Sequence, residues 1–120
     1  MSPASIITTA NFRREAKPLL KKYRSLKPEL ARLVSVMEQN STHGEPLGQD
    51  CYKIRLAIAS KSRGKSGGKS GGARLITYRR VVDAATQTVK LFLLSIYDKS
   101  ETASIGKEEI ARLRQEIPEE

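Results

Sequence analysis

The sequence has few of the residues on which many kinds of functional site depend. It contains no tryptophan, one cysteine (Cys51) and one histidine (His43), and only 5% of its residues are aromatic. A lone cysteine excludes an internal disulfide and any metal site built from several cysteines. A catalytic pair of histidines is excluded in the same way. Cys51 precedes a strand pattern and is interpreted as a packing residue, and His43, beside Gly44, as a solvated turn residue.

Long apolar runs are also absent. No segment approaches the roughly 18 apolar residues that a membrane-spanning helix requires, and the first ten residues lack the basic head and apolar stretch of a secretory signal. A chain of 120 residues has the length of one domain with a modest core, so residues 1–120 are expected to form a single domain. We expect a cytoplasmic protein.

Negative charge is scarce and unevenly distributed. The chain has 22 lysines and arginines against 13 aspartates and glutamates, which gives a net charge of +9. The segment 53–80 has no acidic residue, whereas five carboxylates lie between Glu108 and Glu120. Such a basic body suits a nucleic acid or an acidic protein better than a membrane, because no helix pattern has the apolar face of a membrane anchor. The alternative is a solvated, lysine-rich surface.

Hydrophobic periodicity predicts two helices near the N-terminus. Ile6 to Thr9 is expected to form a short strand. Apolar residues then recur at helical spacing from Phe12 to Tyr23, and Pro18 inside this pattern should kink or restart the helix. A second helix, from Pro28 to beyond Met37, should complete an antiparallel helical hairpin. Asn40 to Asp50, with two glycines and a proline, is predicted to be a loop.

The remaining sequence alternates with the two-residue period of strands. Strands are predicted from Cys51 to Ile58, from Ala73 to Val82 and from Val89 to Tyr97, and a short C-terminal helix from Ile110, ended by Pro118. The third strand should be central, because both of its faces are apolar. One face is expected to carry Val89, Leu91 and Leu93, and the other Phe92, Leu94 and Ile96. The fold class is α+β, with an N-terminal helical hairpin packed on a small antiparallel sheet.

A glycine-rich segment, GKSGGKSGG, separates the first two of these strands. It extends from Gly64 to Gly72 and looks like half of a P-loop written twice. A P-loop needs a glycine five positions before its Gly-Lys-Ser and a helix directly after it. The required positions hold Ala59 and Arg63, and a strand pattern follows. We therefore interpret the segment as a long hairpin loop in which Lys65 and Lys69 can contact a phosphate backbone.

Four segments occur in a particular order: FRREAKPLLKKYRSL from Phe12, CYKIRL from Cys51, GKSGGAR from Gly68 and LSIYDKSE from Leu94. From Phe12 to about Leu113, their order and spacing resemble the RelE/HigB-type toxins of bacterial type II toxin-antitoxin systems. The resemblance implies an α/β toxin that cleaves mRNA on the translating ribosome and is inhibited by a cognate antitoxin, a small acidic helix-turn-helix protein. ParE-type members of the same fold inhibit DNA gyrase, so the fold does not determine the activity.

The chemistry of RNA cleavage can be considered independently of the resemblance. Without a metal, the 2′-hydroxyl must lose a proton, the pentavalent phosphate must be stabilised and the leaving oxygen must be protonated. No acidic cluster is available for Mg²⁺, because Asp83 and Asp98 are isolated, and no cofactor is expected. Strand parity places Lys53 and Arg55 on one face. Arg74 can meet them if its strand pairs antiparallel with theirs.

The resemblance assigns roles to these cations. Lys53 and Arg55 match the family's basic pair on the first hairpin strand, Arg74 its phosphate-stabilising arginine and Lys99 its lysine after the last strand. The sequence departs from the RelE pattern in two ways: Ser100 stands where a second arginine often follows that lysine, and the C-terminal segment has no tyrosine.

Tyr97 can replace the missing tyrosine, because HigB-like members carry a tyrosine at the end of this strand. The competing interpretation is a half-buried packing residue with its hydroxyl at the rim. The general base remains open between Lys53, Tyr97 and Lys99.

Further cations are expected to contact the RNA backbone. These are Arg13, Lys17, Lys21 and Arg24 in one stripe of the first helix, and Lys65, Lys69, Arg79 and Arg80 in the sheet region. Such contacts are independent of sequence and sensitive to salt. The leading hypothesis is a ribosome-dependent mRNA endonuclease. The alternatives are a ParE-like gyrase inhibitor and a non-catalytic basic module that binds nucleic acid.

Overall fold

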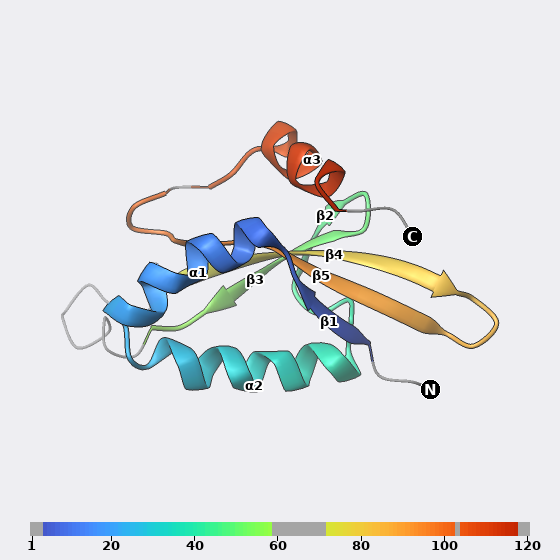
Figure 1. Cartoon of the computed structure of the whole chain (residues 1–120), viewed down its shortest axis with the longest axis horizontal. Coiled ribbons are helices and arrows are strands. Elements are labelled where there is room, and N and C mark those ends of the chain that lie inside the picture. The colour runs from blue at the N-terminus through green and yellow to red at the C-terminus, as the bar shows by residue number, and fades with distance from the viewer. Residues whose placement is uncertain (1–3, 59–71, 103, 118–120) are drawn as a thin grey trace.

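The computed structural model describes residues 4–58, 72–102 and 104–117. It confirms the α+β class (Figure 1). Most of the glycine-rich segment, with Lys65 and Lys69, lies outside the described residues, as does Pro118. In chain order the elements are β1 (Ser5–Thr8), α1 (Ala10–Lys22), α2 (Leu26–Gln39), β2 (Glu45–Gly48), β3 (Cys51–Leu56), β4 (Ala73–Asp83), β5 (Thr88–Asp98) and α3 (Lys107–Gln115).

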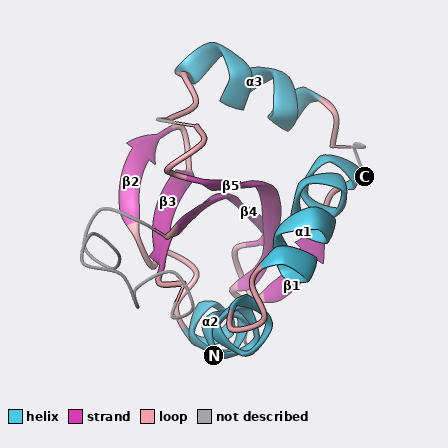
Figure 2. Ribbon diagram, turned by 90° about the vertical axis from the view of Figure 1, so that its left-hand side faces the viewer, coloured by secondary structure: helices cyan, strands magenta, loops and turns pink. Residues whose placement is uncertain are grey.

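The strands form one mixed sheet in the order β1-β5-β4-β3-β2. Strands β2 to β5 form an antiparallel meander, and β1 joins the other side of β5 in parallel. Strand β5 is therefore central, as its two apolar faces predict. Helices α2 and α3 lie on opposite sides of the sheet, with α1 beside β5 (Figure 2).

Helix α1 runs through Pro18 without interruption, so the expectation of a restart there was wrong. A proline inside a helix costs about 3 kcal/mol. The apolar face of α1 continues across it, because Phe12, Ala16 and Leu19 are all buried in one core cluster. That packing offsets the lost hydrogen bond. The Thr9 side chain caps the helix by accepting a hydrogen bond from the Phe12 N–H.

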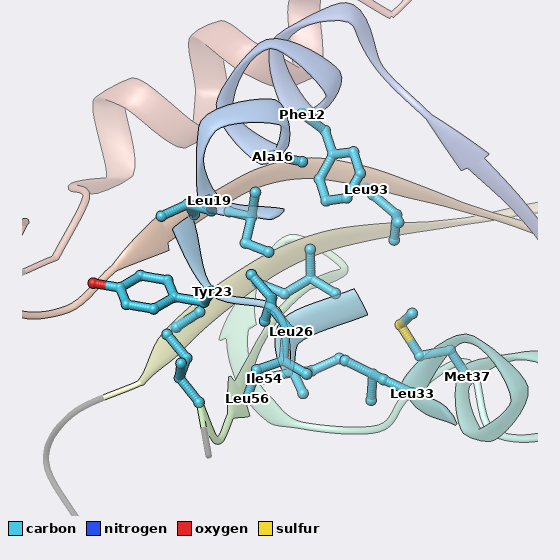
Figure 3. Close-up of a cluster of buried hydrophobic side chains, with 14 of the residues drawn as sticks. Phe12, Ala16, Leu19, Tyr23, Leu26, Leu33, Met37, Ile54, Leu56 and Leu93 are labelled. Carbon is cyan, nitrogen blue, oxygen red and sulfur yellow. The ribbon is translucent and has the colours of Figure 1, made fainter. Parts of the chain in front are cut away.

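The core consists of two clusters, one on each face of the sheet. The larger one joins α1 and α2 to the sheet, and Figure 3 shows Leu26 and Met37 of α2 pointing toward Ile54 and Leu93. The second cluster joins α3 to the opposite face. It contains Cys51, Ile76, Phe92, Leu94, Tyr97, Ile110, Leu113 and Ile117. The face beneath α3 is called the α3 face below.

Strand β2 lies within the segment 40–50, which was predicted to be a loop. It pairs antiparallel with β3, and Glu45 lies opposite Lys53. Gln49 and Asp50, both with positive φ, form the tight turn between the two strands. Pro46 is tolerated because an edge strand has one side that needs no N–H donor. The strand could not be predicted from the sequence because it is short and has turn residues on both sides.

A β-bulge in β5 changes which side chains share a face. The register with β4 shifts between Leu93 and Ser95, so Leu94 has no partner on β4. Beyond the bulge, Ile96 joins the cluster beneath α1 and α2, whereas a strict alternation had placed it with Leu94. Tyr97 is turned to the α3 face by the same shift. Bulges often re-aim a side chain in this way.

Side chains of α1 complete the hydrogen bonding of β5 beyond the end of β1. The Asn11 side-chain amide donates to the Leu94 carbonyl at 2.9 Å. Glu15 Oε1 accepts from the Ile96 N–H at 3.2 Å and from the Ser95 hydroxyl at 2.7 Å. These bonds hold α1 against the segment that carries Tyr97.

Replacing Glu15 by alanine should destabilise the protein, because it leaves these donors without their acceptor. The expected loss is about 1–3 kcal/mol in the free energy of unfolding, measured by urea denaturation. Glu108→Ala removes an exposed carboxylate from α3 and serves as the control. Equal urea midpoints for the two variants would contradict the assigned role of Glu15.

Candidate active site

Three of the predicted site residues form a row across the sheet. Arg55 on β3 lies opposite Arg74 on β4, and Arg74 lies opposite Tyr97 on β5. Directly paired residues of antiparallel strands project from the same face. Arg74 was expected to meet Lys53 and Arg55 if their strands paired antiparallel, and β3 and β4 do pair in this way. The row lies on the α3 face.

Lys53 precedes Arg55 by two residues and shares its face. It lies opposite Glu45 of β2 and lines two recesses. The first, about 450 Å³ in volume, lies between the β2-β3 turn and α3. The second, about 400 Å³ in volume, is also lined by Arg55, His43 and Glu45. Lys53 is half-buried and Arg55 is exposed.

Arg74 is only 4% exposed. It makes one hydrogen bond to a described residue, from Nη1 to the Ala73 carbonyl at 3.2 Å, and no ion pair within the described ranges. A guanidinium carries five N–H donors in a planar fork that matches a phosphate. A buried arginine that no described carboxylate neutralises is well suited to bind an anion.

Tyr97 is buried among apolar side chains of the α3 face. Burial raises the pKa of its hydroxyl, while the positive charge of Arg74 and a hydrogen bond with the Ile105 backbone oppose part of that rise. The hydroxyl therefore stays protonated at neutral pH. Its burial agrees with the packing interpretation, and its place beside Arg74 agrees with a role in the site.

Lys99 follows β5 and lies next to the beginning of β4, because its N–H donates to the Gly72 carbonyl at 3.0 Å. Gly72 has φ +96°, and a Cβ at this position would lie 2.5 Å from the Leu56 carbonyl oxygen. Only glycine fits there. This close approach positions Lys99 at the same end of the sheet as Arg74.

Arg24, predicted as part of the basic stripe of α1, is exposed in the turn that follows the helix, because α1 ends at Lys22. The rest of the stripe, Arg13, Lys17 and Lys21, is exposed on α1. Its C-terminal end lies at the same end of the sheet as Tyr97, where Lys22 pairs with Glu101 at 3.1 Å (Figure 1). Arg79 and Arg80, which were predicted to act together, are separated by the sheet. Arg79 and Arg80 occupy opposite faces of β4: Arg79 donates to the Ser41 hydroxyl at 2.7 Å, whereas Arg80 lies over Phe92 on the α3 face.

Sequence reasoning missed two neighbours of the cations. His43 and Glu45 line the same recess as Lys53 and Arg55, because the β2-β3 hairpin folds them against β3. The sequence signal that could have indicated these neighbours is the turn between β2 and β3. Gly48, Gln49 and Asp50 are turn-forming residues placed directly before the alternating strand.

The structure describes no other centre with obvious chemistry. Among the described residues, no three His, Cys, Asp or Glu side chains come together as candidate metal ligands. No helix described is both long and apolar enough to cross a membrane. Cys51 is buried, and that burial raises the pKa of its thiol.

Two tyrosines should titrate in opposite directions. Hydrogen bonds with Arg114 and Arg80 lower the pKa of Tyr78, whereas burial raises that of Tyr97. In a titration followed by phenolate absorbance, Tyr78→Phe should remove an early-ionising group and Tyr97→Phe a late one. The stability that Tyr97 contributes is complete below its unfolded pKa of about 10 and is lost at higher pH. Identical titration curves for the two variants would contradict these environments.

Comparison with protein-family models and with curated proteins finds no match. Among solved structures, the chain matches a free form of the toxin RelE of E. coli in which two arginines are replaced by alanine. The two chains share 18% sequence identity, the match covers 98% of this chain and 100% of that one, and the TM-score is 0.52. A likeness at this identity concerns the fold. The chain therefore has a RelE-like fold.

Proposed function

We propose that the protein is the toxin of a type II toxin-antitoxin pair and an endoribonuclease that cuts mRNA on the translating ribosome without a metal. The observation that carries the proposal is the row of Arg55, Arg74 and Tyr97, with Lys53 on the same face. The RelE-like fold and the net charge of +9 support it. Neither would suffice alone, because one fold can carry several activities.

The scissile phosphate would bind between Arg55 and Arg74. As the 2′-oxygen attacks phosphorus, negative charge grows on the non-bridging oxygens of the phosphate. Fixed donors aimed at that charge lower the barrier more than mobile ones, because they need no reorganisation during the reaction. Arg74 meets this condition, since its side chain is buried within the row.

The reaction also moves two protons. A base takes the proton of the 2′-hydroxyl, the 2′-oxygen forms a bond to phosphorus, and the bond from phosphorus to the 5′-oxygen breaks. Tyr97 would protonate that leaving oxygen, and its raised pKa supports this role because it keeps the phenol protonated at neutral pH. The same shift makes it a poor base, which leaves Lys53 and Lys99 for that role. The products are a 2′,3′-cyclic phosphate and a 5′-hydroxyl.

The exposed cations of α1 would hold the protein against the ribosome. Arg13, Lys17 and Lys21 are solvent-exposed on α1, and Arg24 is exposed in the turn after it. Contacts of this kind bind an RNA backbone whatever its sequence. The proposed silencing partner is a co-encoded acidic antitoxin in the cytoplasm, whose charge complements this basic chain.

Induced expression in bacteria, followed by growth measurement and mapping of mRNA ends, tests the function. Growth arrest with cleaved mRNA is expected. Arrest with intact mRNA and a DNA-damage response would replace the proposal by ParE-like inhibition of gyrase. Normal growth together with strongly salt-dependent RNA binding would replace it by a non-catalytic binding module.

A further inference from the structure

A second group of cations surrounds an aromatic pair farther along the sheet. Tyr78 on β4 and Phe92 on β5 stack with their ring centroids 6.1 Å apart. The Arg114 guanidinium from α3 lies 4.5 Å from the Tyr78 centroid. Arg80 lies 5.6 Å from the Tyr78 centroid and 5.1 Å from that of Phe92. Arg80 is six residues beyond Arg74 on β4, which corresponds to about 20 Å along the strand.

These two arginines line a cleft of about 500 Å³, together with Gln49, Tyr78 and Gln115. No acidic residue lines it among those that the structure describes. Arg114 Nη1 donates to Gln49 Oε1 at 2.9 Å, while its Nε is buried without a hydrogen-bond partner. The cleft thus presents N–H groups, a phenol and amides, which is a set of groups that favours an anion.

Arg112 of the same helix shows the contrast. It is exposed and paired with two carboxylates, with Nη2 2.5 Å from Glu109 Oε2 and Nη1 2.7 Å from Glu116 Oε2. The charge of Arg112 is therefore balanced locally. Within the described part of the chain, neither Arg80 nor Arg114 forms an ion pair.

The cleft adjoins the larger of the two recesses that Lys53 lines, the one between the β2-β3 turn and α3, because Gln49 and Ala111 border both. The two depressions follow α3 and connect the neighbourhood of the proposed active site to Arg80. Stacked arginine and aromatic side chains beside a basic groove are typical of sites for single-stranded nucleic acid. An acidic protein would need only the charge, whereas a depression that continues from the recess lined by Lys53 suits the strand being cut.

We propose that Arg80 and Arg114 bind a backbone phosphate of the RNA strand several nucleotides away from the scissile bond. This inference rests on the proposed function, because it takes RNA as the substrate. The stacked rings orient the two guanidiniums, and their N–H groups bind the phosphate. The site contributes to substrate affinity and leaves the chemical step unchanged.

Binding of a single-stranded oligonucleotide tests the proposal without requiring cleavage. The probe carries 2′-O-methyl groups, so that it cannot be cut, and its affinity for the full chain is measured by fluorescence anisotropy at several salt concentrations. Arg80→Gln and Arg114→Gln should each weaken binding several-fold and reduce the salt slope by roughly 0.7, the value for one contact on a single strand. Arg112→Gln, the matched control, should change neither quantity.

A second pair of measurements separates this inference from the proposed function. Arg114→Lys keeps the charge without the planar fork, so its salt slope should stay near that of the wild type if the variant is folded. The wild type and all variants could fail to cleave mRNA while Arg80→Gln and Arg114→Gln still show weaker RNA binding and a smaller salt slope. In that case the phosphate site stands and the nuclease proposal falls. Wild-type affinity and slope in both glutamine variants would overturn the site. The site would also be overturned if the two glutamine variants bound RNA normally but lost binding to polyglutamate. That result would identify an acidic protein as the partner.

Discussion

Replacing Arg74 by alanine is expected to abolish toxicity and to reduce mRNA cleavage on ribosomes by about 10²- to 10³-fold, the usual cost of removing one donor that stabilises a transition state. Arg74 lies between Arg55 and Tyr97 in the row, is buried and has no described carboxylate to neutralise it. Growth after induction and the rate of mRNA cleavage are the measurements.

Two further variants make the result specific. Arg74→Lys keeps a positive charge but loses the bidentate fork, so an intermediate rate is expected. Arg32→Ala, in which an exposed arginine paired with Glu29 on α2 is removed, should leave toxicity intact. Thermal unfolding of each variant establishes that the fold persists. A folded Arg74→Ala protein with full toxicity would remove the proposed site.

Replacing Asp98 by alanine should cause the largest loss of stability, about 3 kcal/mol in the free energy of unfolding. Asp98 is 2% exposed. Its carboxylate accepts hydrogen bonds from the Tyr23 hydroxyl at 2.8 Å, from the Ser100 N–H at 3.0 Å and from the Ser100 hydroxyl at 2.8 Å. A buried donor left without its acceptor costs about 1–3 kcal/mol. Urea denaturation measures the loss.

Tyr23→Phe is the matched variant, because it removes only one of these bonds and should cost about 1 kcal/mol. Cleavage should also fall in Asp98→Ala at temperatures where the protein remains folded, since Lys99 follows Asp98 directly and depends on the same turn. A urea midpoint for Asp98→Ala equal to that of Tyr23→Phe would show that the Ser100 bonds contribute nothing.

The sequence predicts the cation pair of β3 because alternation is a local property. Lys53 and Arg55 are two residues apart, so they share a face in any register, and antiparallel pairing of the next strand brings Arg74 to them. Tyr97 is different. The face on which it lies depends on the bulge at Leu94. The residues around the bulge are mostly apolar and include no glycine from which the bulge could be predicted.

The second cationic cluster escaped sequence analysis for a related reason. Charge alone grouped Arg79 with Arg80, although neighbouring residues of a strand point to opposite faces. Arg114 was not among the predicted site residues, because the helical periodicity of α3 identifies only its apolar positions, such as Ile110 and Leu113. Its position over the Tyr78 ring depends on how α3 packs against the sheet.

The proposed reaction at the row on the α3 face is cleavage of RNA by attack of the RNA's own 2′-hydroxyl. Its most direct test is to add the purified protein to translating ribosomes and to identify the chemical groups at the new mRNA ends. The wild type should leave 2′,3′-cyclic phosphates and 5′-hydroxyls, and Tyr97→Phe and Arg74→Ala should leave far fewer of both. Intact mRNA, or cut ends that carry 5′-phosphates, would contradict it.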